Sequence, residues 1–304
     1  MTPAPTLPDP YAAFDVAAED GVTFRLRAYG NRNGTRLVIG HGNGFAVDGY
    51  AGFWTRFLHD FDVLVFDMRN HGQNPGSDPA HHDYAHFARD IETVFRGATE
   101  RLGAKPSIGA FHSLSAQAAL KHAIEIGWVW EALILFDPPN VPAPGHPVHE
   151  PMVGFENRLA RWAGGRRRRF ERPDELARDY AATRAGGWVP GTHALMAHAV
   201  LRRDAAVGDW VLRCPPELEA AVYLEGNTLG LWPNRRDVAG PVAVIAADPE
   251  RPYPVPTALS NRAWAAEGGF DYAAIPGSGH LLQLEQPQAC AEAALAFLQR
   301  VAAA

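Results

Sequence analysis

The sequence predicts an α/β protein with a mostly parallel sheet, flanked by helices and interrupted late by a long helical insertion. Short apolar runs rich in Val, Ile and Leu recur along the chain, as in strands buried on both faces of a parallel sheet. Segments with apolar residues at helical spacing lie between these runs. The stretch from Pro138 to Asp237 breaks this alternation, because it contains no buried-strand run.

The strands are expected from the N-terminal part of the chain onward. Residues 14–30 predict a β-hairpin, because alternating residues flank a turn at Asp20-Gly21. The buried strands that follow are RLVIG (36–40), DVLVFD (62–67), PSIGAF (106–111), ALILFD (132–137) and PVAVIAAD (241–248).

Helices are expected between and after these strands, at residues 49–59, 84–102, 114–126 and 287–302. The late insertion is expected to be mainly helical, with helices at 172–185 and 192–204. Such an insertion is most simply a lid over the C-terminal edge of the sheet, where open α/β sheets bind ligands. We therefore divide the chain into a core of residues 1–137 and 239–304 and a helical lid of residues 138–238.

Composition narrows the class of protein. A net charge of −6 and a pI of about 6.1 give no electrostatic case for nucleic acid or an anionic membrane as a partner. The sequence has no apolar stretch near the ~18 residues that span a bilayer, and we expect no signal peptide, because its first ten residues have neither a basic nor an apolar region. Cys214 and Cys290 are expected to be free thiols in a reducing compartment. We expect a cytoplasmic monomer or homodimer.

The segment GAFHSLSAQ (109–117) predicts a catalytic nucleophile. A serine hydroxyl needs a base and a stabilised oxyanion, and a tight strand-to-helix turn presents it for both. Ser113 follows the strand run PSIGAF and His112 and precedes a helical run, so we expect it to be the nucleophile rather than Ser115. Phe111 stands where such a turn usually has glycine, and we expect small neighbours such as Gly109 or Ala110 to make room.

The acid and the base of a triad should follow the serine in chain order. Asp248 ends the run VAVIAAD, and His280 follows the last strand-like run in a glycine-flanked loop. We expect His280 to act as general base and acid on Ser113, and Asp248 to orient it. Asp137, at the tip of LILFD one strand earlier, is the alternative acid.

Oxyanion donors and substrate contacts come from the same sheet edge. The turn His41-Gly42-Asn43-Gly44 follows a strand, so we expect the backbone N–H of Asn43 to act with that of Leu114 as the oxyanion hole. The residues expected to contact substrate are Phe45, His112 and Trp188. Aromatic residues of the insertion favour an apolar acyl or alcohol group.

Five motifs together resemble the α/β-hydrolase superfamily, in particular its serine-nucleophile, esterase- or lipase-like members with a helical lid after the sixth strand. They are VIGHGNGF (38–45), VFDMRNHGQNPGSD (65–78), PSIGAFHSLSAQAAL (106–120), IAADPERP (245–252) and PGSGHLLQLEQP (276–287). The resemblance covers nearly the whole chain. It implies an α/β-hydrolase fold with a mostly parallel eight-stranded sheet, and an enzyme that hydrolyses without a cofactor.

These features predict a hydrolase that cleaves a carboxylic ester through an acyl-enzyme on Ser113. The alternatives on the same fold are C–C bond hydrolysis, lactone opening, acyl transfer and a lyase reaction. An inactive binding protein on the same fold is the alternative of another class, and only Phe111 favours it.

Two further segments have a structural interpretation. The run RRRR (166–169) is expected to be a solvated lid face that pairs with acids of FERPDE (170–175), rather than an anion site. His82 and His86 could share a helical face as metal ligands would. Since the sequence offers no third ligand, we expect no metal site.

Overall fold

The computed structural model describes residues 6–183 and 187–303. Its main sheet has eight strands in the order β1-β2-β4-β3-β5-β6-β10-β11. The strands are β1 (Ala12–Ala17), β2 (Thr23–Gly30), β3 (Arg36–Ile39), β4 (Asp62–Phe66), β5 (Ser107–His112), β6 (Ala132–Phe136), β10 (Val242–Ala246) and β11 (Asp271–Ala274). β2 pairs antiparallel with β1 and β4, and all other neighbours in this sheet are parallel. The predicted mostly parallel eight-stranded sheet is therefore confirmed.

The buried runs form central strands because both of their faces are covered. β3, β4, β5, β6 and β10 are buried at every residue. β1, at the sheet edge, alternates between half-buried and exposed residues, as an edge strand with one solvated face does. Gly21 makes the turn between β1 and β2 with φ 82°, a conformation that glycine adopts without a steric penalty.

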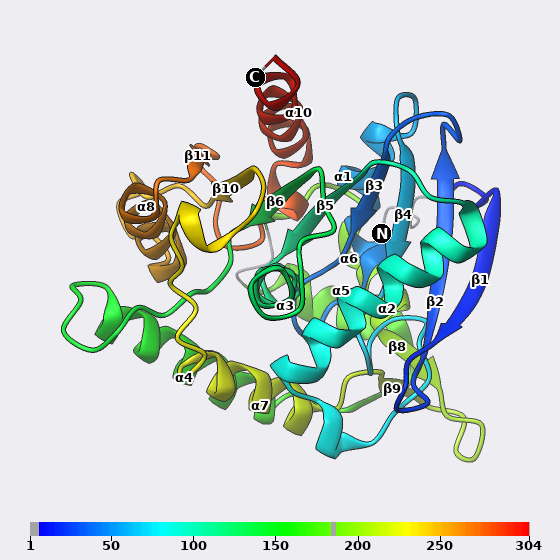
Figure 1. The fold of residues 1–304 in the computed structure, drawn as a ribbon. Coiled ribbons are helices and arrows are strands. Elements are labelled where there is room, and N and C mark those ends of the chain that lie inside the picture. Colours follow the sequence, from blue (N-terminus) through cyan, green and yellow to red (C-terminus); the bar gives the residue numbers. More distant parts are fainter. Residues whose placement is uncertain (1–5, 184–186, 304) are drawn as a thin grey trace.

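Helices cover both faces of the sheet (Figure 1). One apolar cluster joins the sheet to α2 (Tyr84–Leu102), α3 (Leu114–Glu125) and α8 (Pro256–Gly268). A second cluster joins the other face to α1 (Ala51–Trp54), α9 (Leu282–Glu285) and α10 (Pro287–Ala303). The helix expected at 49–59 is a short α1 between two 3-10 turns, η1 (Val47–Tyr50) and η2 (Thr55–Phe57).

Residues 138–238, called the insert below, lie between β6 and β10. Its helices are α4 (His149–Gly164), α5 (Pro173–Ala181), α6 (Thr192–Val200) and α7 (Pro216–Gly226). Figure 1 shows α4 and α7 side by side, at the end of the sheet opposite to α10. The C-terminal ends of the parallel strands, which carry Ser113 and Asp137, face the insert.

The insert is mainly helical, as expected, but it also contains three short strands that the sequence did not predict. β7 (Arg169–Phe170), β9 (Trp210–Leu212) and β8 (Leu201–Arg203) form an antiparallel sheet in that order. The helix expected at 192–204 ends at Val200. A turn closes behind it, in which Gly208 donates to the Asp204 carbonyl at 2.8 Å and Asp204 donates to the Asp209 carbonyl at 2.8 Å. In this hairpin the backbone N–H and C=O groups of residues 201–203 form hydrogen bonds with the neighbouring strand β9 instead of within a helix.

Candidate active site

The nucleophile turn lies between β5 and α3. β5 ends at His112, α3 begins at Leu114, and Ser113 between them has φ 51° and ψ −113°. A non-glycine residue at positive φ stores strain that the surrounding structure must stabilise. Here Ser113 donates its backbone N–H to the Phe136 carbonyl at 3.0 Å, at the end of the neighbouring strand β6. The turn thus lifts the Ser113 hydroxyl above the sheet edge.

Ser113, His280 and Asp137 form a hydrogen-bonded chain. His280 Nε2 lies 3.0 Å from Ser113 Oγ, and His280 Nδ1 lies 2.6 Å from Asp137 Oδ2. A carboxylate only accepts, so Nδ1 carries the proton and the Nε2 lone pair faces the hydroxyl. This is the tautomer that a general base on Ser113 needs.

Asp137 is fixed by other residues as well as by His280. It is fully buried and has φ 42° directly after β6. Its Oδ1 accepts from the Ala247 N–H and from Asn261 Nδ2, each at 3.0 Å, and its Oδ2 accepts from Thr257 Oγ1 at 2.5 Å. Thr257 and Asn261 belong to α8, and neither of them was expected from the sequence. Nothing in the local sequence marks them, because they reach Asp137 only through the packing of α8.

The expectation that Asp248 orients His280 is wrong. The Asp248 carboxylate accepts from the Glu250 N–H at 2.8 Å and from the Gly277 N–H at 2.7 Å, so it caps two exposed turns. These hydrogen bonds lower the pKa of Asp248, with the Gly277 N–H making the larger contribution. The alternative acid, Asp137, occupies the place beside His280 instead.

The loop after β3 lies against the nucleophile turn, and Asn43 and Ser113 line the same cavity. In the described part of the chain, the N–H groups of Asn43 and Leu114 have no acceptor. A Cβ placed on Gly42 would lie 3.3 Å from Ser113 Cβ, so the loop runs directly against the turn. These two N–H groups come from the two segments that flank Ser113, as donors to an oxyanion would.

Two buried, neutral imidazoles fix the same loop. His41 Nδ1 lies 2.8 Å from the Gly42 carbonyl, and the Gly44 N–H donates to His71 Nε2 at 3.1 Å. Burial lowers the pKa of His41 to about 4 and that of His71 to about 3, so both rings stay neutral near pH 7. The carbonyl before Asn43 and the N–H after it are thereby satisfied, while the Asn43 N–H is not. The Asn43 side chain donates to the Glu219 carbonyl of the insert at 2.8 Å.

Phe111 points away from the serine into the core. It is fully buried and contacts Phe66 and Trp130 edge to face, at ring-centroid distances of 6.4 and 5.5 Å. A Cβ on Gly109 would lie 2.4 Å from the Phe111 ring, and one on Gly40 would lie 3.1 Å from it. The expectation that Gly109 makes room is confirmed, and Gly40, directly after the neighbouring strand β3, contributes as well.

A cavity of about 320 Å³ opens over Ser113 and His280. Its walls include the three residues expected to contact substrate, Phe45, His112 and Trp188. The insert contributes mostly apolar and aromatic side chains, namely Phe155, Leu159, Trp162, Tyr180, Trp188 and Tyr223. Phe155 stands edge to face with the His280 ring at 6.2 Å. Core and insert therefore enclose one largely apolar space around the serine.

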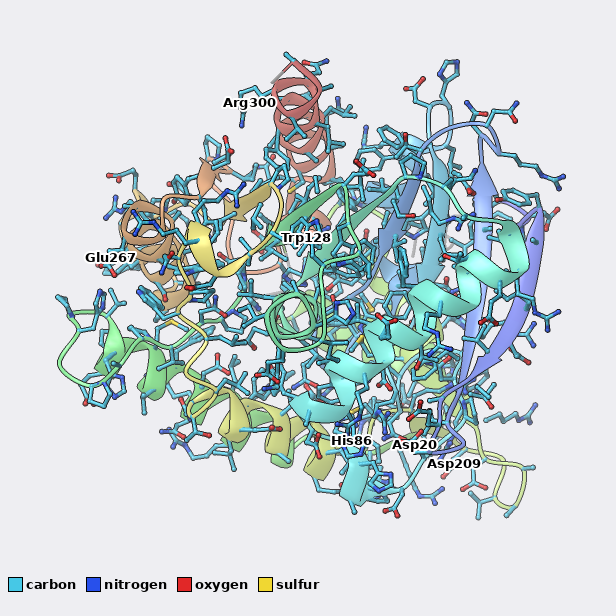
Figure 2. The ribbon with its side chains drawn as sticks, in the orientation of Figure 1. Asp20, His86, Trp128, Asp209, Glu267 and Arg300 are labelled. Atoms are coloured by element: carbon cyan, nitrogen blue, oxygen red, sulfur yellow. The ribbon has the colours of Figure 1, made fainter. Side chains whose placement is uncertain are left out.

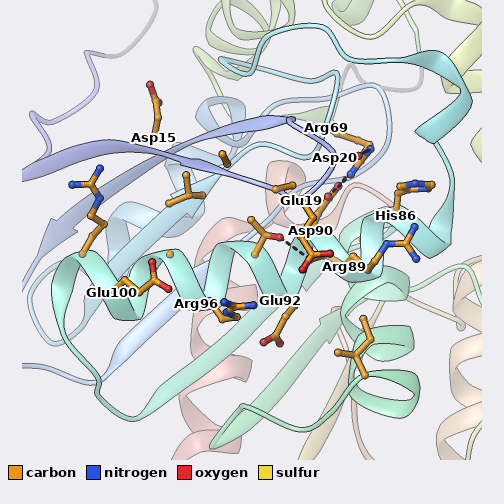
Figure 3. A pocket seen from close by; sticks show the side chains of 17 residues that line it. Asp15, Glu19, Asp20, Arg69, His86, Arg89, Asp90, Glu92, Arg96 and Glu100 are labelled. Atoms are coloured by element: carbon orange, nitrogen blue, oxygen red, sulfur yellow. Dashed lines mark hydrogen bonds and ion pairs between the residues drawn. The ribbon is translucent and has the colours of Figure 1, made fainter.

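A larger groove of about 690 Å³ lies elsewhere, between β1, the turn after it and α2. Figure 3 shows it lined by charged side chains of both signs, among them Asp20, Arg69 and Asp90. Arg69 forms salt bridges with Asp20 and with the fully buried Asp90, so these charges neutralise one another within the protein. The described residues that line this groove include no serine, and they form no apolar wall like the one over Ser113. The groove is therefore the weaker candidate for catalysis.

At one end of this groove, Asp20, His81 and His86 bring possible metal-ligand atoms within 4.8 Å of one another (Figure 2 labels Asp20 and His86). Arg69 Nη1 lies 2.9 Å from Asp20 Oδ2, which would set a guanidinium beside any bound cation. The pair that the sequence suggested, His82 with His86, is not brought together, because His82 is buried against His71 and Phe87.

The four arginines of residues 166–169 all pair with acids. The pairs are Arg166–Glu219, Arg167–Glu175, Arg168–Glu217 and Arg169–Asp204. Three of these arginines are half-exposed, in agreement with a solvated face, but only Glu175 comes from residues 170–175. Arg166 is buried, and its partner Glu219 packs against Gly44 of the loop after β3.

An α/β sheet with a hydrogen-bonded Ser-His-Asp chain at its C-terminal edge defines a class of hydrolase-like proteins. The model of the alpha/beta hydrolase family matches residues 37–293, which is more than half of the chain. The protein belongs to this family. No helix among the described residues is both long and apolar enough to cross a membrane.

Solved structures share the fold at low sequence identity. E-2-(acetamidomethylene)succinate hydrolase has a TM-score of 0.73 and 16% identity, over 95% of this chain and 100% of that one. The thioesterase domain from the curacin biosynthetic pathway has a TM-score of 0.70 and 14% identity, over 93% and 99%. A thermophilic esterase from Thermogutta terrifontis has a TM-score of 0.65 and 18% identity, over 95% and 99%. No curated protein matches the sequence.

Proposed function

We propose that the protein is a serine hydrolase that cleaves a carboxylic ester, with Ser113 as nucleophile, His280 as general base and acid, and Asp137 as the residue that orients His280. The observation that carries this proposal is the chain of contacts from Ser113 Oγ through both nitrogens of His280 to a buried Asp137. Each group is within direct hydrogen-bond reach of the next, as proton transfer requires.

The reaction follows from these contacts. Ser113 Oγ attacks the ester carbonyl while its proton passes to His280 Nε2, and the N–H groups of Asn43 and Leu114 stabilise the oxyanion. The imidazolium then protonates the leaving alcohol as the C–O bond breaks, which leaves an acyl group on Ser113. Water, deprotonated by His280, attacks this acyl group, and the carboxylic acid departs as the serine regains its proton.

The cavity supports an apolar acyl or alcohol group of modest size as the bound part of the substrate. Its volume of about 320 Å³ is at the lower end of the range for small-molecule pockets. In this proposal the insert acts as a lid that excludes water from the acyl-enzyme, because α4 and the aromatic residues around Trp188 cover the serine. A thioesterase domain and an esterase among the proteins of similar fold are compatible with acyl transfer to water.

Replacement of the nucleophile tests the proposal. Wild-type protein should hydrolyse p-nitrophenyl butyrate and react with a fluorophosphonate probe, and Ser113→Ala should lose the labelling and about 10⁴-fold or more of kcat/KM. Ser115→Ala is the matched control. Among the described residues, the Ser115 hydroxyl hydrogen-bonds only the backbone of His112, so this variant should still be labelled.

Hydrolysis by Ser113→Ala at the wild-type rate would contradict the proposal. A panel with matched p-nitrophenyl esters, a thioester, an anilide and a lactone, read by product analysis, assigns the bond that is cleaved. Labelling without turnover of any ester on the panel would favour one of the other activities on this fold.

A further inference from the structure

The side chain of His112, the residue before the proposed nucleophile, joins three loops of the site. Its Nε2 lies 2.9 Å from the backbone carbonyl of His280, and its Nδ1 lies 2.8 Å from the Tyr50 hydroxyl. The Tyr50 oxygen in turn accepts from the Gly42 N–H at 3.2 Å. A continuous path therefore runs from the loop that carries Asn43, through the nucleophile turn, to the loop that carries His280.

The direction of each hydrogen bond is fixed by its partners. A backbone carbonyl only accepts, so His112 Nε2 carries the ring proton and Nδ1 accepts from the Tyr50 O–H. The phenol oxygen is left to accept from Gly42. For a neutral His112, this is the tautomer that satisfies all three hydrogen bonds.

Burial keeps both side chains in that state. Tyr50 and His112 are 0% and 1% exposed. Burial lowers the pKa of His112 to about 3, and the neighbouring His280 adds to this effect. Burial also raises the pKa of Tyr50 above its ordinary value, so the phenol keeps the proton that it donates.

Gly42 makes the close approach possible. A Cβ at this position would lie 2.8 Å from His112 Nδ1 and 3.3 Å from Ser113 Cβ. The absence of a side chain lets the loop lie against His112, where its N–H reaches the Tyr50 hydroxyl. The Ser113 backbone is covalently next to His112, so a shift of the imidazole moves the nucleophile as well.

We propose that Tyr50 and His112 are positioning residues, which set the distance between the nucleophile, the base and the oxyanion donor by bridging their three loops. This inference rests on the proposed serine-hydrolase function. Their hydrogen bonds reach the loops of the reacting groups through backbone atoms of Gly42 and His280, and in this proposal they supply no proton to the reaction. Their contribution is the fixed geometry that transition-state stabilisation requires, since a misplacement of about 1 Å can reduce a rate by about 10²-fold.

The test removes one hydrogen-bonding group at a time. Tyr50→Phe deletes the hydroxyl and frees both the Gly42 N–H and His112 Nδ1. We expect kcat/KM for p-nitrophenyl butyrate to fall by about 10- to 100-fold, mainly through kcat. The affinity for a trifluoromethyl ketone, which forms an oxyanion on Ser113, should fall by the same factor. His112→Gln keeps a donor for the His280 carbonyl and should retain more activity than His112→Leu.

Tyr84→Phe is the matched control. Tyr84 is 2% exposed, and its hydroxyl donates to Gln117 Oε1 at 2.5 Å on α3, so the variant also loses a buried phenol hydrogen bond. It should lower the Tm as Tyr50→Phe does while leaving the trifluoromethyl ketone affinity unchanged. If Tyr50→Phe behaves like Tyr84→Phe in both measurements, the bridge is only structural and the inference is overturned.

The hydrogen bonds of His112 can also be observed directly, by a measurement that does not depend on catalytic activity. In ¹⁵N NMR spectra at pH 7, wild-type His112 should be neutral with its proton on Nε2, and Tyr50→Phe should shift the Nδ1 resonance. A proton on Nδ1 in the wild type would overturn the bridge itself. The failure of the proposed function would look different. In that case the wild-type protein would neither hydrolyse esters nor react with the fluorophosphonate, yet its His112 spectrum would be as expected. The hydrogen-bonded bridge would then remain as a structural element only.

Discussion

At the scale of single residues, the environment of Asp137 distinguishes it from Asp248. Both follow a buried strand, and sequence position alone left the two open. Asp137 accepts hydrogen bonds from Ala247, Thr257 and Asn261, so its carboxylate is oriented in a fully buried site. Asp248 caps two exposed turns. The difference arises from α8, whose contacts no local pattern encodes.

Replacing each aspartate by asparagine should separate the two roles. Asp137→Asn should lower kcat by about 10³- to 10⁴-fold, because an amide at this place favours the wrong tautomer of His280. Asp248→Asn should change kcat less than about threefold and act on stability alone. Steady-state kinetics on p-nitrophenyl butyrate, with circular dichroism to verify folding, measures both. A large loss of kcat in Asp248→Asn with full activity in Asp137→Asn would reverse the assignment.

At the scale of elements, the nucleophile turn tolerates a large side chain because the neighbouring strands supply the space. The sequence singled out Phe111 as an anomaly and Gly109 as a source of room. The role of Gly40 was not foreseen, since it directly follows β3 and meets Phe111 only through the parallel pairing of β3 with β5. Phe111 therefore belongs to the core beneath the nucleophile turn, and its side chain leaves the geometry of that turn intact.

A double-mutant cycle can measure this dependence. Gly109→Ala alone should destabilise the protein by about 1–3 kcal/mol, because the new Cβ would lie 2.4 Å from the Phe111 ring and 2.6 Å from Leu133. In a Phe111→Leu background the same change should cost less, since part of the space is vacated. Urea unfolding of the four proteins gives the coupling energy. Strict additivity would mean that Gly109 and Phe111 do not share this space.

At the scale of the whole molecule, the mostly parallel sheet could be predicted, because buried apolar runs alternate with helical segments along the chain. Ser113, His280 and the two oxyanion donors were also inferred from strand-end positions. The small sheet of the insert was not. Its strands have two or three residues, too few for a periodic pattern, and the hairpin at Asp204–Gly208 that pairs them is a tertiary arrangement. The supports of the site, such as Thr257 and Tyr50, likewise come from distant elements.

The buried histidines give the whole fold a predictable response to acid. His41, His71, His82 and His112 are buried, and burial lowers their pKa values to between about 3 and 4. In the unfolded chain a histidine has a pKa of about 6.5. Between these values the unfolded chain binds protons that the native state does not. The free energy of unfolding therefore falls as the pH falls below about 6.5, by about 1.4 kcal/mol per pH unit for each such histidine.

Glu156 opposes this trend but cannot reverse it. Burial raises its pKa to about 8, so between pH 4.5 and 8 its native state binds a proton that the unfolded chain releases, and stability falls as the pH rises. Burial also raises the pKa of Asp90 to about 6 and the pKa values of Asp48 and Glu225, so these carboxyls offset part of the effect of the four histidines below pH 6.5. Urea unfolding at pH 7 and pH 5 should thus show a markedly lower free energy of unfolding at pH 5. His112→Gln should reduce that difference by about one histidine's share, whereas replacement of His59, whose side chain is 93% exposed, should not. Equal stability at both pH values would mean that these imidazoles are not held neutral in the folded protein.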